Sequence, residues 1–126
     1  MGEQDKGDGG SVRMPRPLAF LVLAAIATTA QAASFDCARA RAPDEKAVCA
    51  SRALNDADVK MATLYSLDLR FVPMGGRDHL HDDQRAFLAA RKACTANRAC
   101  ISRLYDRRIA ALQAVIDTRV YPHGPF

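Results

Sequence analysis

The sequence has no tryptophan, and aromatic residues make up only 6% of its 126 positions. β-Sandwiches and barrels depend on β-branched and aromatic side chains, so this scarcity argues against an all-β fold. The 49% apolar content comes mainly from Leu, Ile, Val, Met and Ala, which suit a helical core. A chain of this length is expected to form one domain.

The residues that enzymes use are also scarce beyond residue 33. Glu45 is the only glutamate there, no two aspartates are spaced for glycoside chemistry, and no glycine-rich loop opens a helix as a phosphate site requires. The serines lack the context of a nucleophile elbow; they are Ser34, Ser51, Ser66 and Ser102. We therefore predict a protein that is not an enzyme and has no cofactor.

Long apolar runs are absent as well. The run at residues 18–27 has about ten residues, whereas a membrane span needs roughly 20. Arg13 and Arg16 precede this run and Ala30-Gln31-Ala32 follows it, which is typical of a secretory signal peptide cleaved between Ala32 and Ala33. The alternative interpretation of the segment is a buried N-terminal helix.

The signal peptide divides the chain into a leader at residues 1–32, a domain at residues 33–118 and a tail at residues 119–126. Residues 1–13 are either an over-long start, with Met14 as the true initiator, or an extended leader. A lipoprotein signal would place cysteine at the first mature position, and no cysteine stands there. We expect a periplasmic or secreted protein with no stable membrane anchor.

The domain contains four cysteines, Cys37, Cys49, Cys94 and Cys100. An even number in a small exported domain indicates disulfides, and four cysteines allow three pairings that spacing alone does not separate. We favour Cys37–Cys49 and Cys94–Cys100, because each pair brackets one predicted turn. The alternative, a zinc site, would need spacings that this sequence does not have.

Helical signals fill the domain. Pro43-Asp44-Glu45 predicts a helix at about 43–50, and Asn55 or Asp56 is expected to cap a second helix that ends near Phe71. Pro73 and the glycines that follow predict a loop at 73–77.

Asp78, Asp82 and Asp83 then offer caps for a third helix that reaches Cys94, with Phe87, Leu88 and Arg91 at helical spacing. Asn97 is expected to cap a fourth helix. Its apolar stripe consists of Ile101, Leu104, Tyr105, Ile109, Leu112 and Ile116. The prediction is an all-α, antiparallel bundle of about four helices with two disulfides.

Two clusters could bind a ligand. The first is His79-Leu80-His81-Asp82-Asp83, which could hold a metal only if a loop brought the side chains together; we predict a solvated segment and no metal. The second is an excess of basic residues over 82–108, and Arg98, Arg103 and Arg107 could form a patch for anionic envelope polymers or lipid headgroups. The alternative is an ordinary solvated face. No nucleic acid is expected, because a net charge of +4 is too small.

Four blocks of the sequence resemble the LprI-type lysozyme inhibitor family over about residues 35–113. The first block is Phe35-Asp36-Cys37 with residues 42–51, which matches D-C followed by T/A-P-x-E-x-x-I/V-C. The other matching residues are Leu54, Asp58, Met61 and Tyr65 in the second block, Gln84, Arg85, Phe87, Leu88, Arg91 and Cys94 in the third, and Cys100, Ile101, Tyr105, Arg108, Ile109 and Leu112 in the fourth.

The resemblance implies a small disulfide-bonded envelope protein that binds and inhibits a lysozyme-type muramidase. The chain departs from some relatives because it lacks a lipoprotein signal. The chain also has a net charge of +4, and a basic inhibitor is not steered electrostatically toward the basic lysozymes of animals. The alternative function is a non-enzymatic module that binds anionic envelope components.

The matching polar residues Asp58, Arg91, Tyr105 and Arg108 are compatible with one buried network across the last three helices. An ion pair between Asp58 and one of the arginines would explain why polar residues lie beside apolar stripes. The alternative for these residues is direct contact with a partner.

Overall fold

The structure is a computed structural model that describes residues 33–120. Within this range the chain is all-α, as predicted, with four α-helices and no strand. The predicted signal peptide at residues 1–32, including Ala32, and the tail residues 121–126 lie outside the described residues. None of the described helices combines the length and the apolarity that crossing a membrane requires.

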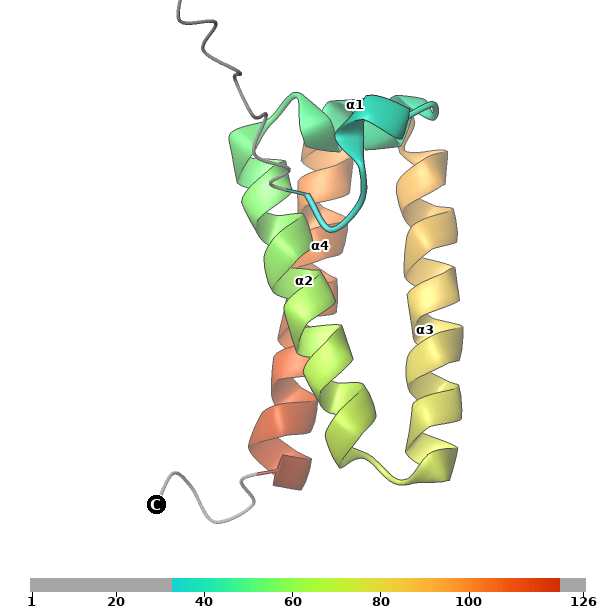
Figure 1. Ribbon diagram of the computed structural model, residues 1–126, viewed down its shortest axis with the longest axis vertical. Coiled ribbons are helices and arrows are strands. Elements are labelled where there is room, and N and C mark those ends of the chain that lie inside the picture. The colour runs from blue at the N-terminus through green and yellow to red at the C-terminus, as the bar shows by residue number, and fades with distance from the viewer. Residues whose placement is uncertain (1–32, 121–126) are drawn as a thin grey trace, which may run out of the picture.

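The helices are α1 (Pro43–Cys49), α2 (Arg52–Phe71), α3 (Met74–Ala93) and α4 (Arg98–Val115). A 3₁₀ turn, η1 (Cys37–Arg39), precedes α1, and a π-helical turn, η2 (Ile116–Val120), continues α4. In Figure 1, α2, α3 and α4 run along the long axis in alternating directions, and α1 lies across one end. We call this end the disulfide end, and we call the opposite end, where α2 turns into α3, the distal end.

Local side-chain chemistry explains where α1 and α4 begin. Asn97 caps α4 as predicted, because its Oδ1 accepts a hydrogen bond from the backbone N–H of Cys100 at 3.0 Å. Pro43 occupies the first position of α1, where its missing N–H costs nothing. The Glu45 carboxylate accepts hydrogen bonds from the backbone N–H groups of Arg41 and Ala42, at 2.9 and 3.1 Å.

The predicted start of the second helix is wrong. α2 begins at Arg52, because Ser51 acts as the cap and its Oγ accepts from the N–H of Leu54 at 3.5 Å. The predicted caps Asn55 and Asp56 therefore lie inside the helix. A serine cap was available before both of them, at Ser51, and a helix that starts there buries Leu54.

The predicted loop at 73–77 is also wrong, because α3 begins at Met74. Pro73 suits the position before the first helical turn, since its φ is fixed and it lacks an N–H. Gly75 and Gly76 form part of that turn, at a cost of about 1 kcal/mol each relative to alanine. The predicted caps of this helix all lie within it; they are Asp78, Asp82 and Asp83.

The core lies where α2, α3 and α4 face one another and where α1 closes the disulfide end. Val48, Ile101 and Leu112 are fully buried, and the rings of Phe87 and Tyr105 pack edge to face with centroids 5.2 Å apart. Every member of the stripe predicted for the fourth helix is buried or half-buried. Leu88, which was placed on the third helix's stripe, is instead 42% exposed.

Both disulfides have the predicted pairing. Cys37–Cys49 ties η1 to the end of α1, and Cys94–Cys100 ties the end of α3 to the start of α4. Each closes a short loop, with Cα atoms 5.7 Å apart. No cysteine in the described part of the chain is free.

Candidate functional site

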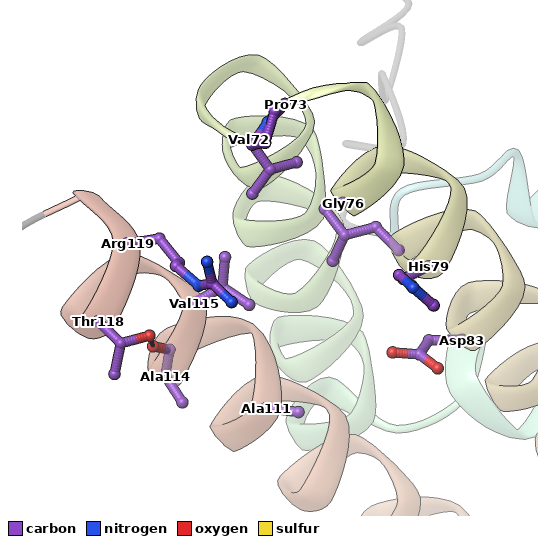
Figure 2. A pocket seen from close by; sticks show the side chains of 11 residues that line it. Val72, Pro73, Gly76, His79, Asp83, Ala111, Ala114, Val115, Thr118 and Arg119 are labelled. Atoms are coloured by element: carbon purple, nitrogen blue, oxygen red, sulfur yellow. Dashed lines mark hydrogen bonds between the residues drawn. The ribbon is translucent and has the colours of Figure 1, made fainter.

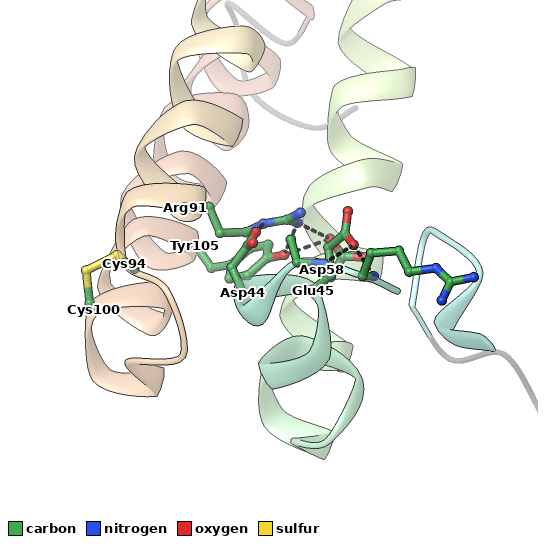
Figure 3. A network of polar contacts seen from close by, with 9 residues as sticks. Asp44, Glu45, Asp58, Arg91, Cys94, Cys100 and Tyr105 are labelled. Atoms are coloured by element: carbon green, nitrogen blue, oxygen red, sulfur yellow. Dashed lines mark hydrogen bonds and ion pairs between the residues drawn. A yellow bond between two sulfur atoms is a disulfide. The ribbon is translucent and has the colours of Figure 1, made fainter. Parts of the chain in front are cut away.

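Four buried polar side chains, one from each α-helix, meet near the disulfide end (Figure 3). Arg91 of α3 donates from Nε to Asp44 Oδ2 of α1 at 2.8 Å, and from Nη1 to the hydroxyl of Tyr105 of α4 at 3.0 Å. The Tyr105 hydroxyl donates to Asp58 Oδ1 of α2 at 2.8 Å. We call this set, Asp44, Asp58, Arg91 and Tyr105, the four-helix network.

The N-terminal segment covers this network. The backbone N–H of Ser34 donates to Asp58 Oδ2 at 2.6 Å, and the Phe35 ring lies 5.5 Å from the guanidinium carbon of Arg91. The ring therefore shields the guanidinium from water and makes a cation–π contact with it. Residues just after the predicted cleavage position are thus part of the packed domain.

Burial fixes the charge states in this network. Burial raises the pKa of the Tyr105 phenol far above its usual value, and the charge of Asp58 raises it further. Burial alone would lower the pKa of Arg91, but the nearby Tyr105 and Asp44 outweigh it and raise that pKa. Tyr105 therefore stays a neutral donor and Arg91 a cation at neutral pH, which suits a role in holding helices together and not one in proton transfer.

The structure brings together Asp58, Arg91 and Tyr105 but places Arg108 elsewhere. Arg108 lies on α4 toward the distal end, where its Nε donates to Gln84 Oε1 at 3.1 Å and its Nη2 donates to the carbonyl of Leu80 at 3.3 Å. The expected ion pair involves Arg91, whose Nη1 lies 3.7 Å from Asp58 Oδ1.

Sequence reasoning missed Asp44, which is 2% exposed. An acid in the first turn of a helix is already explained by the helix dipole. The sequence pattern therefore did not indicate that Asp44 has a partner 47 residues away. The available signal was the pair Asp44-Glu45, since Glu45 alone satisfies the N–H groups before the helix.

The histidine cluster does not converge. His79 and His81 lie two residues apart on α3, so they point to different sides of the helix. His81 Nδ1 is 2.6 Å from the Tyr65 hydroxyl, and Asp83 Oδ2 is 3.6 Å from Arg108 Nη1. Within residues 33–120, no group of three or more potential ligands could hold a metal ion.

The three arginines of the predicted basic patch, Arg98, Arg103 and Arg107, are all exposed on α4. Across the described ranges, none of them makes an ion pair or a side-chain hydrogen bond. Their charges are therefore available to solvent or to a partner.

The distal end has a pocket of about 500 Å³ between α3 and the end of α4 (Figure 2). Apolar residues such as Leu80 and Val115 line it, together with His79, Asp83 and Arg119. Near this end Asp68 is completely buried, and neither carboxylate oxygen has a hydrogen-bond partner among the described residues. Burial raises the pKa of Asp68, and Arg108 only partly offsets that rise.

Comparison with known proteins places this arrangement in a family. The family model described as "Lysozyme inhibitor LprI" matches residues 37–112. The chain belongs to the LprI lysozyme inhibitor family. The LprI match begins and ends on residues of the packed domain, Cys37 and Leu112, and it contains both disulfides and the four-helix network. No match was found among curated proteins or among solved structures.

Proposed function

We propose that this LprI chain is an exported protein that binds a lysozyme-type muramidase and inhibits it. The observation that carries the proposal is the family match over residues 37–112, which covers α1, α2 and α3 and most of α4. Inhibition requires no catalytic group from the inhibitor, only a stable surface that occupies the enzyme. Two disulfides stabilise the bundle that presents such a surface.

The export step rests on the leader at residues 1–32 and on the cysteines. Disulfides persist in oxidising compartments such as the periplasm, which favours export. Ala33 and Phe35 pack against the core, so a domain that starts at Ala33 keeps the contacts of its N-terminal segment. Mass spectrometry of protein recovered from a periplasmic extract should give an N-terminus at Ala33, and an intact leader would contradict this.

The inhibition is tested with the mature domain in a lysozyme turbidity assay on killed bacterial cells. We expect the domain to slow lysis by at least one lysozyme class in a dose-dependent way. Reduced and alkylated domain serves as the control, because it should lose the packed surface. Unchanged lysis by every lysozyme class, even at large molar excess, would refute the proposal.

A second candidate function is binding of anionic envelope components. The observation that favours it is the exposure of Arg98, Arg103 and Arg107 without partners in the part of the chain that is described. Binding to vesicles rich in phosphatidylglycerol should weaken as salt rises above about 0.1 M, because exposed charges are screened. Binding that is unchanged by salt, or by the double variant Arg103→Ala/Arg107→Ala, would exclude it.

A further inference from the structure

The turn between α2 and α3 exposes the two least buried large apolar side chains of the described chain. Phe71, the last residue of α2, is 59% exposed, and Met74, the first residue of α3, is 77% exposed. Only Val72 and Pro73 separate the two helices, so the connection between them is short (Figure 1). We call residues 70–77 the α2–α3 corner.

Hydrogen-bond donors surround these apolar side chains. No side chain caps the start of α3, and its first turn contains no acid. The first backbone hydrogen bond of this turn is donated by Arg77 to the carbonyl of Pro73, so the N–H groups of Met74, Gly75 and Gly76 have no partner within the helix. These N–H groups carry the positive end of the helix dipole.

Two arginines add full positive charge to the corner. Arg70 and Arg77 are both exposed, and within residues 33–120 neither makes an ion pair or a side-chain hydrogen bond. The corner thus combines apolar contact area, backbone donors and unpaired cations in one exposed turn. Beside it opens the 500 Å³ pocket, to which Val72 and Gly76 contribute.

We propose that the α2–α3 corner is the part of this inhibitor that enters the substrate cleft of the muramidase, an inference that rests on the proposed function. Enzymes that hydrolyse glycosidic bonds have a pair of carboxyl groups flanking the scissile bond. Cations and free N–H donors complement those carboxylates, and the Phe71 and Met74 side chains supply the apolar contact that concave sites favour.

Other exposed surfaces fit such a cleft less well. The outer face of α4 carries Arg103 and Arg107, but none of the large exposed apolar residues is on that helix. The outer face of α2 carries Val59 and Leu67, which are 41% and 39% exposed and lie along a helix side and not at an end. Leu88 lies on the side of α3 and is 42% exposed. Among the described residues, the corner carries the two most exposed large apolar side chains, and two unpaired arginines flank them.

The test compares the mature domain with two corner variants, Phe71→Ser/Met74→Ser and Arg70→Ser/Arg77→Ser. Because all four side chains are exposed, circular dichroism and the melting temperature should stay as in the wild type. Residues at the centre of an interface commonly cost tenfold or more in affinity when truncated, so the inhibition constant should rise by about tenfold or more in each variant.

Two matched controls alter exposed residues of the same kinds elsewhere: Val59→Ser/Leu67→Ser and Arg103→Ser/Arg107→Ser. Both should inhibit within about twofold of the wild type, because near-neutral positions dominate most protein surfaces. Inhibition by the wild type should also be competitive with a soluble N-acetylglucosamine oligomer, which occupies the same cleft.

The possible failures are distinguishable. If the wild type inhibits but the corner variants inhibit equally well, or if inhibition is not competitive with the oligomer, the corner is not the inserted element and the proposed function stands. If the wild type inhibits no lysozyme class, the proposed function fails and the assignment of the corner fails with it.

Discussion

Tyr105 hydrogen-bonds to both a cation and an anion in the four-helix network. Its hydroxyl accepts from Arg91 and donates to Asp58, and its ring packs on Phe87. A single oxygen atom therefore links Arg91 of α3 to Asp58 of α2. Tyrosine is required at this position for the hydroxyl, since phenylalanine would fill nearly the same volume.

Replacing Tyr105 by phenylalanine should lower the free energy of unfolding by about 1–3 kcal/mol, because it leaves a buried donor on Arg91 and a buried acceptor on Asp58 less well satisfied. Urea unfolding of the mature domain measures the change. The control is Tyr65→Phe, whose hydroxyl contacts the exposed His81 and should matter less. Equal losses of stability in the two variants would contradict a stabilising role of the four-helix network.

Asp68 shows the opposite situation, a buried carboxylate without a hydrogen-bond partner in the described chain. Burial raises its pKa in the folded state, so the folded state holds the proton more tightly than the unfolded state does. The stability that comes from this proton is fully present below the ordinary carboxyl pKa and is lost as the pH rises through the raised value. At neutral pH, which is above the ordinary carboxyl pKa, the burial of Asp68 therefore lowers the stability of the fold.

Asp68→Asn should raise the free energy of unfolding at about pH 7 by about 1 kcal/mol, the scale of an unsatisfied buried group. The gain should shrink as the pH falls from about 7 through the raised pKa and should be smallest at about pH 4 and below, where the carboxyl is protonated in the folded state. Urea unfolding at both pH values measures this. Asp56→Asn is the control, because Asp56 is exposed and its contact with Arg52 is long, at 4.0 Å. A loss of stability at pH 7 would show that Asp68 has a favourable role in the fold.

At the scale of elements, the two glycines of α3 differ in their surroundings. A Cβ added to Gly75 would meet no atom within 4 Å, whereas one added to Gly76 would lie 3.1 Å from the Cβ of Val72. Val72 is buried, so it has little room to shift. Gly76 thus permits α3 to pack closely on the end of α2, and Gly75 has no such role.

Gly75→Ala should stabilise the domain by about 0.5–1 kcal/mol, because alanine loses less conformational entropy on entering a helix. Gly76→Ala should gain less or lose stability, since the new methyl group crowds Val72. Thermal unfolding of both variants measures the difference. A larger gain at Gly76 than at Gly75 would contradict the close approach of the two helices.

The sequence predicted α4 best, because an asparagine cap and a continuous apolar stripe both indicated a helix in the same segment. It failed at the start of α3, where proline and two glycines have strong loop preferences that packing of Val72 and Leu80 overrides. In the four-helix network, the motifs shared with the LprI family pointed to Asp58, Arg91 and Tyr105. Asp44 was missed because its position in the first turn of a helix is already explained by the helix dipole.

For the molecule as a whole, each disulfide lies on one side of the α2–α3 corner. Cys37–Cys49 is in the first half of the chain and Cys94–Cys100 is in the second. The two halves are therefore joined by a single covalent link, the connection between α2 and α3. Chain-entropy estimates give about 2–3 kcal/mol for each of these short loops, a large part of a small domain's stability.

A protease site engineered between Val72 and Pro73 tests this topology. After cleavage, a denaturing gel without reductant should show two separate fragments, because no disulfide crosses the cut. Intact domain in the same gel is the control. Fragments that stay joined until reductant is added would overturn the pairing.

Both disulfides and the four-helix network also lie at one end of the bundle, and this has a consequence for motion. The free energy of local opening should decrease along the long axis from the disulfide end to the distal end. The distal end should therefore open locally more often than the disulfide end. In hydrogen exchange, the hydrogen-bonded amides of residues 46–49 and 101–105 should exchange only with global unfolding, and those of residues 77–80 through smaller openings. The distal end can then adjust its shape against a rigid partner while the disulfide end stays folded. Uniform protection of the amides along α3 would contradict this difference between the two ends.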